Sequence, residues 1–232
     1  MDLDLDKHFL GATKVATALA LAAKQHHKQM RKSPAVPYII HPVRVMMVLH
    51  RYGVTDSDIL AAALLHDTVE DTDLTVADIF NAYGKRVSDF VVDVSEQKMD
   101  GNKKRPWKMR KQYCISMVRH GMHWPSVAIK LADQIDNMSS TAMAQRAHYG
   151  GNVPDDTLDF WVEFGGNAKS QYWYSAGIYM SAVKRLSLED VCENGLRAKI
   201  RDMTTEIREL LWTTYGELAA TLPMVTDTQA MD

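Results

Sequence analysis

Apolar residues recur at helical spacing through most of the chain, and polar or proline-containing breaks separate these runs. Ala, Leu and Val occupy most positions from about Phe9 to Lys28, which predicts a first helix. Proline is well tolerated at the first helical position, so Pro42 predicts the start of a second helix, which Gly53 ends. Asp56 is then expected to cap a third helix that contains the apolar run 59–65.

The rest of the chain repeats this alternation of helices and short breaks. Further helices are expected at 75–83, 85–97, 107–120 and 126–138, near 158, and over 167–186 and 195–222. Loops are expected from Ala147 to Asp156 and over the polar, basic stretch from Lys98 to Pro106. Because no alternating strand pattern of useful length occurs, the pattern predicts an all-α helical bundle in a single compact domain. Its core is expected over residues 8–190, followed by a C-terminal helical extension at 195–222 and a frayed tail.

Composition and charge narrow the kind of protein. Only 12 glycines and 7 prolines occur in 232 residues, which favours long uninterrupted helices. The 27 basic and 29 acidic residues nearly cancel, which argues against binding to long nucleic acid. The longest apolar stretch, Ala16 to Ala23, is too short to cross a membrane, and the acidic N-terminus is unlike a signal peptide. Two cysteines are too few for a disulfide framework, so reduced thiols in a cytoplasmic protein are expected. Together with the lack of a long apolar stretch, this predicts that the protein has no membrane partner.

A compact polar motif follows the apolar run of the third helix. His66, Asp67, Glu70 and Asp71 place four ionisable groups within six residues, and burying such groups without partners is costly. On a continuous helix, residues four apart share a face, so His66 would pair with Glu70 and Asp67 with Asp71. Taken alone, the motif is most simply a solvated, capped helix end, and further metal-binding side chains are needed to indicate a metal site.

Two such side chains occur elsewhere in the chain. His41 precedes Pro42 at a predicted helix start, and Asp133 lies inside an apolar helix, where a buried carboxylate needs a strong partner. Asn137, four residues on, shares the helix face of Asp133. The candidate metal ligands are therefore His41, His66, Asp67 and Asp133. This mixed nitrogen and oxygen set suits Mn²⁺ or a similar ion with open water positions better than a closed zinc site.

Four blocks of sequence resemble, in order, the hydrolase domain of the bacterial RelA/SpoT alarmone enzymes. They are 26–32 (HHKQMRK), 37–42 (PYIIHP), 61–72 (AAALLHDTVEDT) and 129–138 (IKLADQIDNM). Together they contain the H…HD…D signature of the HD-domain metal-dependent phosphohydrolases. Single-domain members of that family, the metazoan SpoT homologues among them, are similar in length to this chain. The resemblance covers about residues 8–140 and implies an HD-domain helical bundle.

The resemblance also implies an activity and a set of site residues. The family removes the 3′-pyrophosphate of ppGpp or pppGpp with Mn²⁺, and a chain of this length would be a hydrolase without synthetase activity. By resemblance, the four candidate ligands bind one metal ion, while Glu70 and Asp71 position and deprotonate the attacking water. Phosphoester hydrolysis does require a metal ion that lowers the pKa of water and a nearby carboxylate that accepts a proton. The substrate-binding residues implied in the same way are Arg31, Lys32, Asn137, Lys98, Lys169 and Tyr172.

The sequence departs from the family pattern beside Asp133, and the departures leave the substrate open. Members of the family usually have an arginine or lysine at the position of Gln134, and they often have His or Tyr at the position of Asp136. An arginine is also common in the family where this chain has Ser139. Positive charge near the substrate phosphates is therefore lower than usual. The stretch 141–166 is longer than in the small hydrolases. The aromatic residues in it and after it either reshape the base pocket or pack in the core; they are Phe160, Trp161, Tyr172, Trp173 and Tyr174. The alternatives are hydrolysis of ppApp, NADPH or a (d)NTP, or nucleotide binding with little turnover; the oligomeric state is also open, a homo-oligomer included.

Overall fold

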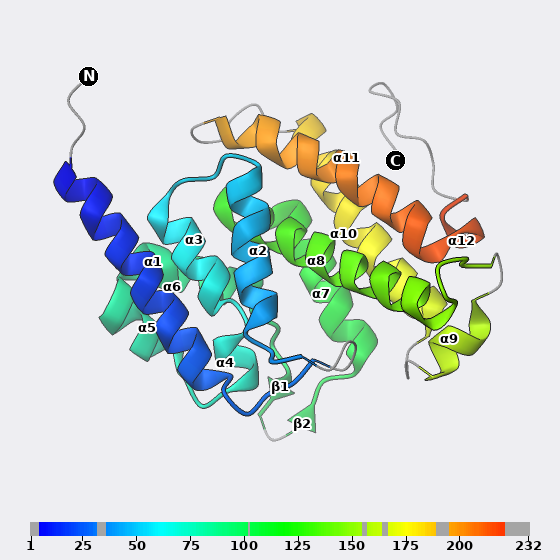
Figure 1. Cartoon of the computed structure of the whole chain (residues 1–232). Coiled ribbons are helices and arrows are strands. Elements are labelled where there is room, and N and C mark those ends of the chain that lie inside the picture. Colours follow the sequence, from blue (N-terminus) through cyan, green and yellow to red (C-terminus); the bar gives the residue numbers. More distant parts are fainter. Residues whose placement is uncertain are drawn as a thin grey trace.

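Helices make up most of the described chain, in the order that the breaks in the sequence indicate (Figure 1). The computed structural model describes residues 5–31, 36–101, 103–154, 157–163, 167–188 and 195–220. The helices are α1 (Leu5–Gln25), α2 (Ile40–Arg51), α3 (Ser57–Leu65), α4 (Thr68–Asp71), α5 (Val76–Tyr83), α6 (Lys85–Val94), α7 (Trp107–His120), α8 (Trp124–His148), α9 (Leu158–Glu163), α10 (Ala168–Leu188), α11 (Leu196–Tyr215) and α12 (Glu217–Ala220). Within these residues, β1 (Met99–Asp100) and β2 (Lys103–Lys104) pair as a short antiparallel hairpin. The all-α prediction is confirmed.

Local side-chain chemistry sets the starts of several helices. The Asp56 carboxylate accepts a hydrogen bond from the backbone N–H of Asp58 at 2.8 Å, so the predicted cap of α3 is confirmed. Thr75 and Asp78 form a reciprocal capping box at the start of α5. Gly84 ends that helix with φ of 85°, a left-handed backbone conformation that glycine adopts readily.

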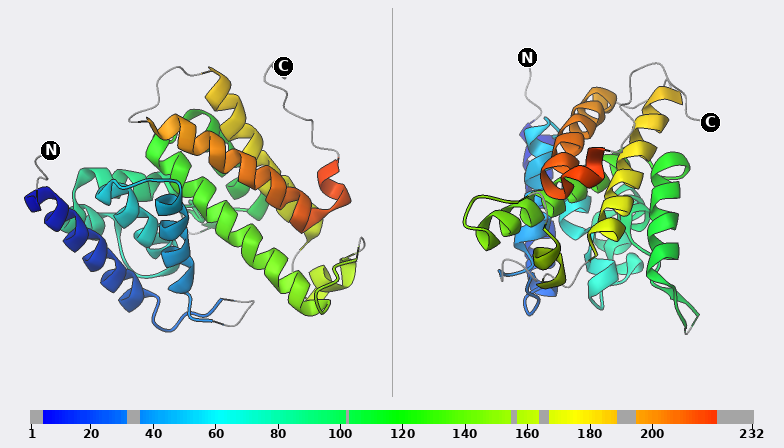
Figure 2. Two further views of the ribbon diagram at one scale, coloured as in Figure 1. Left: turned by 45° about the horizontal axis from the view of Figure 1, so that its top comes forward. Right: turned by 90° about the vertical axis from the view of Figure 1, so that its right-hand side faces the viewer.

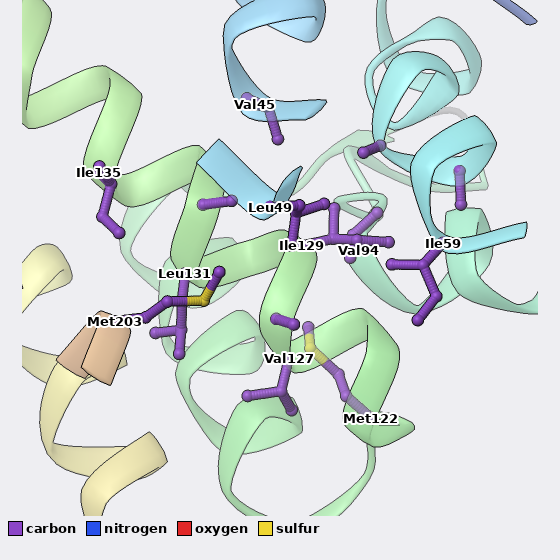
Figure 3. Close-up of a cluster of buried hydrophobic side chains, with 14 of the residues drawn as sticks. Val45, Leu49, Ile59, Val94, Met122, Val127, Ile129, Leu131, Ile135 and Met203 are labelled. Atoms are coloured by element: carbon purple, nitrogen blue, oxygen red, sulfur yellow. The ribbon is translucent and has the colours of Figure 1, made fainter. Parts of the chain in front are cut away.

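The core is built around α8, which α2, α3, α6, α10 and α11 contact. Figure 3 shows apolar side chains from four of these elements, Val45, Leu49, Ile59, Val94 and Met203, beside Val127, Ile129, Leu131 and Ile135 of α8. Every residue from Trp124 to Asp136 is buried, so this part of α8 has no solvent face. Its polar side chains must therefore find partners inside the protein.

Two predicted helix ends are wrong, and one expected loop contains a hairpin. The helix expected to end at residue 138 continues to His148, so the loop expected from Ala147 begins later. The helix expected over 85–97 ends at Val94. The stretch expected to be an irregular loop after Lys98 contains the β1–β2 hairpin, whose turn uses the positive φ of 56° at Gly101.

The C-terminal helix α11 runs alongside α8 in both Figure 1 and Figure 2, and the two helices are in contact. It buries Ile200, Met203, Ile207 and Leu211 against the core. The expected end of this extension at 222 and the expected frayed tail lie outside the described residues. Among the described helices, none combines the length and apolar character needed to cross a membrane.

Candidate metal centre and its cavity

His41 lies in the first turn of α2 and is buried. Its Nε2 atom is 3.3 Å from Oδ1 of Asp133 and 3.5 Å from Oδ2 of Asp67. Its Nδ1 atom is 2.7 Å from Oδ2 of Asp136. Because an ionised carboxylate only accepts hydrogen bonds, Nδ1 carries the hydrogen in this pair, and Nε2 faces the other two carboxylates.

His66 and Asp67 lie in the turn between α3 and α4, so residues 66–71 do not form one continuous helix. Nδ1 of His66 donates to the carbonyl oxygen of Ala63 at 2.8 Å, so in the neutral imidazole the lone pair is on Nε2. That Nε2 atom lies 3.0 Å from Oδ2 of Asp67, but in an orientation that makes no hydrogen bond, and it is fully buried. A buried nitrogen that makes no hydrogen bond is the atom a metal ion would satisfy.

The donors fit a divalent metal ion. One ligand atom from each of His41, His66 and Asp133 lies within 4.8 Å of the others, and Oδ2 of Asp67 is close to both imidazoles. Two imidazole nitrogens with carboxylate oxygens form a donor set suited to borderline-hard divalent ions. The structure therefore brings together the four side chains that the sequence indicated.

Neighbouring side chains orient these ligands. The Tyr38 hydroxyl donates to Asp67 at 2.6 Å, and Lys130 Nζ donates to Asp133 at 2.9 Å. Asn137 Nδ2 donates to the other oxygen of Asp133 at 2.5 Å. Such supporting hydrogen bonds hold a ligand at the angle that a metal ion requires.

The electrostatics favour a cation at this point. Burial raises the pKa of the Asp133 carboxyl, but Lys130 and His41 outweigh it and hold that pKa well below its usual range. Burial likewise raises the pKa of Asp67, and the two histidines bring it below the ordinary value. Burial alone lowers the pKa of His41, yet its hydrogen bonds with Asp133 and Asp136 raise that pKa to about 9. Without a metal ion, a proton on His41 thus compensates part of the negative charge, and a metal ion must displace that proton to bind Nε2.

Glu70 and Asp71 of α4 lie on the rim of the same cavity. Oε1 of Glu70 accepts a hydrogen bond from the backbone N–H of Glu96. Lys98 Nζ donates to Asp71 Oδ1 at 2.5 Å and to the carbonyl oxygen of Glu70 at 3.1 Å. Burial, and then the negative charge of Asp67, raises the pKa of Glu70, which is the direction that makes a carboxylate a better proton acceptor.

The cavity that contains these groups has a volume of about 420 Å³. Its lining includes four cationic side chains, Arg31, Lys98, Lys111 and Lys130. Arg31 donates to Oδ2 of Asp136 at 2.7 Å and to Oδ1 of Asn137 at 2.9 Å, so its guanidinium is held at the wall. Acidic and basic side chains thus face one space, as binding a metal ion together with a phosphate requires.

Not every residue implied by the resemblance reaches the cavity. Arg31, Lys98 and Asn137 line it, but Lys169 is exposed and does not, and Tyr172 packs edge-on against Tyr215 with ring centroids 5.6 Å apart. Three other residues of α10 line the cavity instead: Gln171, Tyr174 and Ser175. Lys169 and Tyr172 therefore lie on other faces of α10 than the residues that line the cavity, and their contact with a substrate stays a prediction. Lys32 lies outside the described residues.

Asp136 lies at the site, although from the sequence it stood out only as a departure from the family pattern. Its carboxylate contacts His41 and Arg31 through Oδ2, and Nε of Arg44 lies 2.6 Å from Oδ1. The signal was its position three residues after Asp133, which places both carboxylates on neighbouring parts of one helix face. Tyr38, Lys130 and Glu96 were also missed, because their roles depend on contacts between distant segments.

Comparison with known proteins agrees with this geometry. The family model described as "HD domain" matches residues 18–169, so the chain belongs to the HD-domain family. Its relatives include the human "Guanosine-3′,5′-bis(diphosphate) 3′-pyrophosphohydrolase MESH1", which is 37% identical over 129 residues, 55% of this chain and 69% of the human protein. The "Guanosine-3′,5′-bis(diphosphate) 3′-pyrophosphohydrolase" of Aquifex aeolicus is 33% identical over 151 residues, 65% of this chain and 21% of that longer protein.

Two solved structures share the fold. The structure described under "A metazoan ortholog of SpoT hydrolyzes ppGpp and plays a role in starvation responses" aligns with a TM-score of 0.59 and 24% identity, over 83% of this chain and 94% of that one. A protein of Listeria monocytogenes strain EGD-e aligns with a TM-score of 0.60 and 28% identity, over 75% of this chain and 98% of that one. The HD-domain helical bundle expected from the sequence is confirmed.

Proposed function

We propose that this protein is a metal-dependent pyrophosphohydrolase that removes the 3′-diphosphate of ppGpp and pppGpp. The observation that carries the proposal is a single cavity of about 420 Å³ that holds metal donors, the carboxylate of Glu70 with its raised pKa, and the cations Arg31 and Lys98. Relatives named for this reaction support the choice of substrate.

The metal that we propose is Mn²⁺, bound by His41, His66, Asp67 and Asp133. The orphaned Nε2 of His66 and the mixed nitrogen and oxygen donors support it. When bound, such an ion lowers the pKa of water and compensates the negative charge of the phosphates.

The side chains of the cavity perform the remaining chemistry. Glu70 accepts a proton from water while the water oxygen forms a bond to the phosphorus attached to O3′ of the ribose. The bond between that phosphorus and O3′ breaks, O3′ keeps the electron pair, and it takes up the proton that Glu70 held. The products from ppGpp are pyrophosphate and GDP. Asp71, held by Lys98 at 2.5 Å, orients the water, while Arg31 and Asn137 bind the nucleoside part.

The test is a product assay with Mn²⁺ over a panel of ppGpp, ppApp, NADPH and deoxynucleoside triphosphates. We expect pyrophosphate and GDP from ppGpp. Cleavage of the triphosphates alone would contradict the alarmone substrate, and binding without cleavage of any compound would contradict an enzymatic function.

Glu70→Gln tests the role of the base. The change removes a proton acceptor but keeps the shape of the side chain, so we expect kcat to fall about 100-fold or more while ppGpp still binds. Glu209→Gln, at an exposed position of α11, is the matched control and should leave kcat unchanged. Full activity of Glu70→Gln would remove Glu70 from the mechanism.

A further inference from the structure

Two aromatic side chains from outside the metal-binding segments line the cavity. Trp161 belongs to α9, and Tyr215 is the last residue of α11. Their rings stack with centroids 5.6 Å apart and planes 9° apart, and both border the cavity. We call this pair the aromatic wall. The sequence left open whether Trp161 shapes a pocket or fills the core, and the structure places it at the border of the cavity.

Specific contacts hold Trp161 in place. Asp159, two residues before it, accepts a hydrogen bond from the Tyr149 hydroxyl and lies 3.3 Å from Nε2 of His148. Phe160 packs edge-on against the ring of His148, with centroids 5.7 Å apart. These contacts tie α9 to the C-terminal end of α8, where Figures 1 and 2 both show it. The position of the wall is therefore built into the fold.

The wall lies at the end of the cavity away from the metal donors. Asp133, Asn137 and Thr141 all line the cavity, on successive turns of α8. With a rise of about 1.5 Å per residue, Thr141 is about 12 Å along the helix axis from Asp133, in the direction of α9. The cavity thus extends from a charged end, past Asn137, to an end lined by aromatic rings.

Polar but uncharged side chains of α8 and α10 also line the cavity. Gln171, Ser175 and Thr141 all border the cavity. An amide such as that of Gln171 both donates and accepts hydrogen bonds, as the edge of a purine does. Aromatic rings with uncharged hydrogen-bonding groups suit a planar heterocycle, whereas a phosphate needs cations.

We infer that the aromatic wall recognises the nucleobase of the substrate: the purine packs against Trp161 and Tyr215, and Gln171 bonds to its edge. The inference rests on the proposed function and assigns base recognition in part to α9 and α11. Residue 215 lies beyond the segment 18–169 that matches the HD-domain family, so this chain adds a base contact from outside that segment.

The test compares two ligands that share a diphosphate, GDP and inorganic pyrophosphate, because only GDP carries a base. Their dissociation constants are measured by calorimetry with the Mn²⁺-loaded protein. For Trp161→Ala we expect the Kd for GDP to rise about tenfold or more, as loss of one base–aromatic contact does, while the Kd for pyrophosphate stays within about twofold. Trp161→Phe should recover most of the affinity for GDP. Trp212→Ala removes a tryptophan that is 58% exposed on α11, and it should change neither constant.

Other outcomes separate this inference from alternatives. An unchanged Kd for GDP in Trp161→Ala overturns it, and equal weakening of both ligands also overturns it, because that would indicate a general distortion of the cavity. Trp161 is buried, so Gln171→Ala at the partly exposed cavity surface provides a second variant if Trp161→Ala does not fold. Gln171→Ala should also raise the Kd for GDP and leave the Kd for pyrophosphate unchanged. An unchanged Kd for GDP would again contradict the inference.

Failure of the proposed function would look different. If the wild-type protein binds GDP through the wall but cleaves no alarmone, the proposed function fails and the inference stands. If ppGpp is cleaved and Trp161→Ala changes neither KM nor the Kd for GDP, the inference fails alone. The outcome that supports both is a higher KM in Trp161→Ala with kcat within about threefold of wild type.

Discussion

At the scale of single residues, the site depends on a few side chains that support the metal donors. Asp136 holds the imidazole of His41 and also contacts two arginines, Arg31 and Arg44. Lys130 plays the same part for Asp133, with its amine at 2.9 Å from the carboxylate. Both residues are buried, so changing either one alters the charge next to a metal donor without solvent to screen it.

Asp136→Asn should weaken metal binding. The change keeps the shape of the side chain but removes the negative charge that orients Nδ1 of His41, and loss of such a partner costs about 10- to 100-fold in metal affinity. Titration with Mn²⁺ by calorimetry measures the effect. Asp202→Asn, at an exposed position of α11, serves as the control. Equal affinities of wild type and Asp136→Asn would show that Asp136 does not support the ligand.

Lys130→Met should destabilise the metal-free protein. Removing one partner of a buried ion pair leaves the charge of Asp133 only partly compensated by His41, which costs about 3 kcal/mol or more of the free energy of unfolding. Added Mn²⁺ should recover part of this loss, because a cation at the site compensates the same carboxylate. Urea unfolding with and without Mn²⁺ tests both points, and a variant as stable as wild type without metal would contradict the role given to Lys130.

At the scale of secondary-structure elements, local caps set the starts of α3 and α5, whereas packing carries α8 past its expected end. The caps at Asp56 and Thr75 involve residues two or three positions apart, so a local sequence pattern suffices to predict them. The end of α8 at His148 had no such local signal. Its last turns bury Ala142 and Gln145, and Gln145 donates to the carbonyl oxygen of Thr214 in α11.

Asp56→Ala should lower the free energy of unfolding by about 1 kcal/mol at neutral pH, the usual cost of losing a cap. Burial by itself raises the pKa of Asp56, but hydrogen bonds from Arg86 and from the Asp58 N–H lower it below its ordinary value of 3.8. The stabilisation is therefore present above pH 3.8 and is lost as the pH falls through the lower pKa of the folded state.

Urea unfolding at pH 7 and at acidic pH measures this effect. The difference in the free energy of unfolding between wild type and Asp56→Ala should become smaller as the pH is lowered. Asp73→Ala, in the loop before α5, removes an exposed carboxylate that caps no helix and should change the free energy of unfolding little at either pH. A difference in the free energy of unfolding that grows at low pH would contradict the role of Asp56 as a cap.

At the scale of the whole molecule, one helix, buried from Trp124 to Asp136, connects the candidate metal centre to the rest of the fold. α8 contributes Asp133 and Asp136 to the site and packs against α2, α3, α6, α10 and α11. The donors come from α2, from the turn after α3 and from α8, so a metal ion would cross-link segments that are far apart in the chain.

Removal of metal should therefore lower stability as well as activity. We expect a chelator to abolish hydrolysis and to lower the unfolding temperature, because Asp67 and Asp133 are left ionised close to each other. At a Mn²⁺ concentration of about 100 times its Kd, binding stabilises the folded state by about 2.7 kcal/mol. Thermal unfolding with chelator and after return of Mn²⁺, Mg²⁺ or Zn²⁺ measures this. Identical unfolding temperatures with and without every ion would contradict a metal site at this position.

The sequence by itself determined the helical class, most helix starts and the four candidate metal ligands that the structure brings together. These features depend on local information: apolar spacing, caps such as Asp56, and the chemistry of residues such as His41 and His66. The ordered blocks also indicated the HD-domain family, which the comparison confirms.

Only the tertiary structure decided which polar and aromatic side chains meet. Arg31 and Asp136 are 105 positions apart in the chain, and Trp161 and Tyr215 come from different helices. The sequence did not show which residues of α10 line the cavity, because the rotation of this helix about its axis depends on what it packs against. Helix packing is set by the sum of many weak contacts between distant segments, and no local pattern of residues contains that sum.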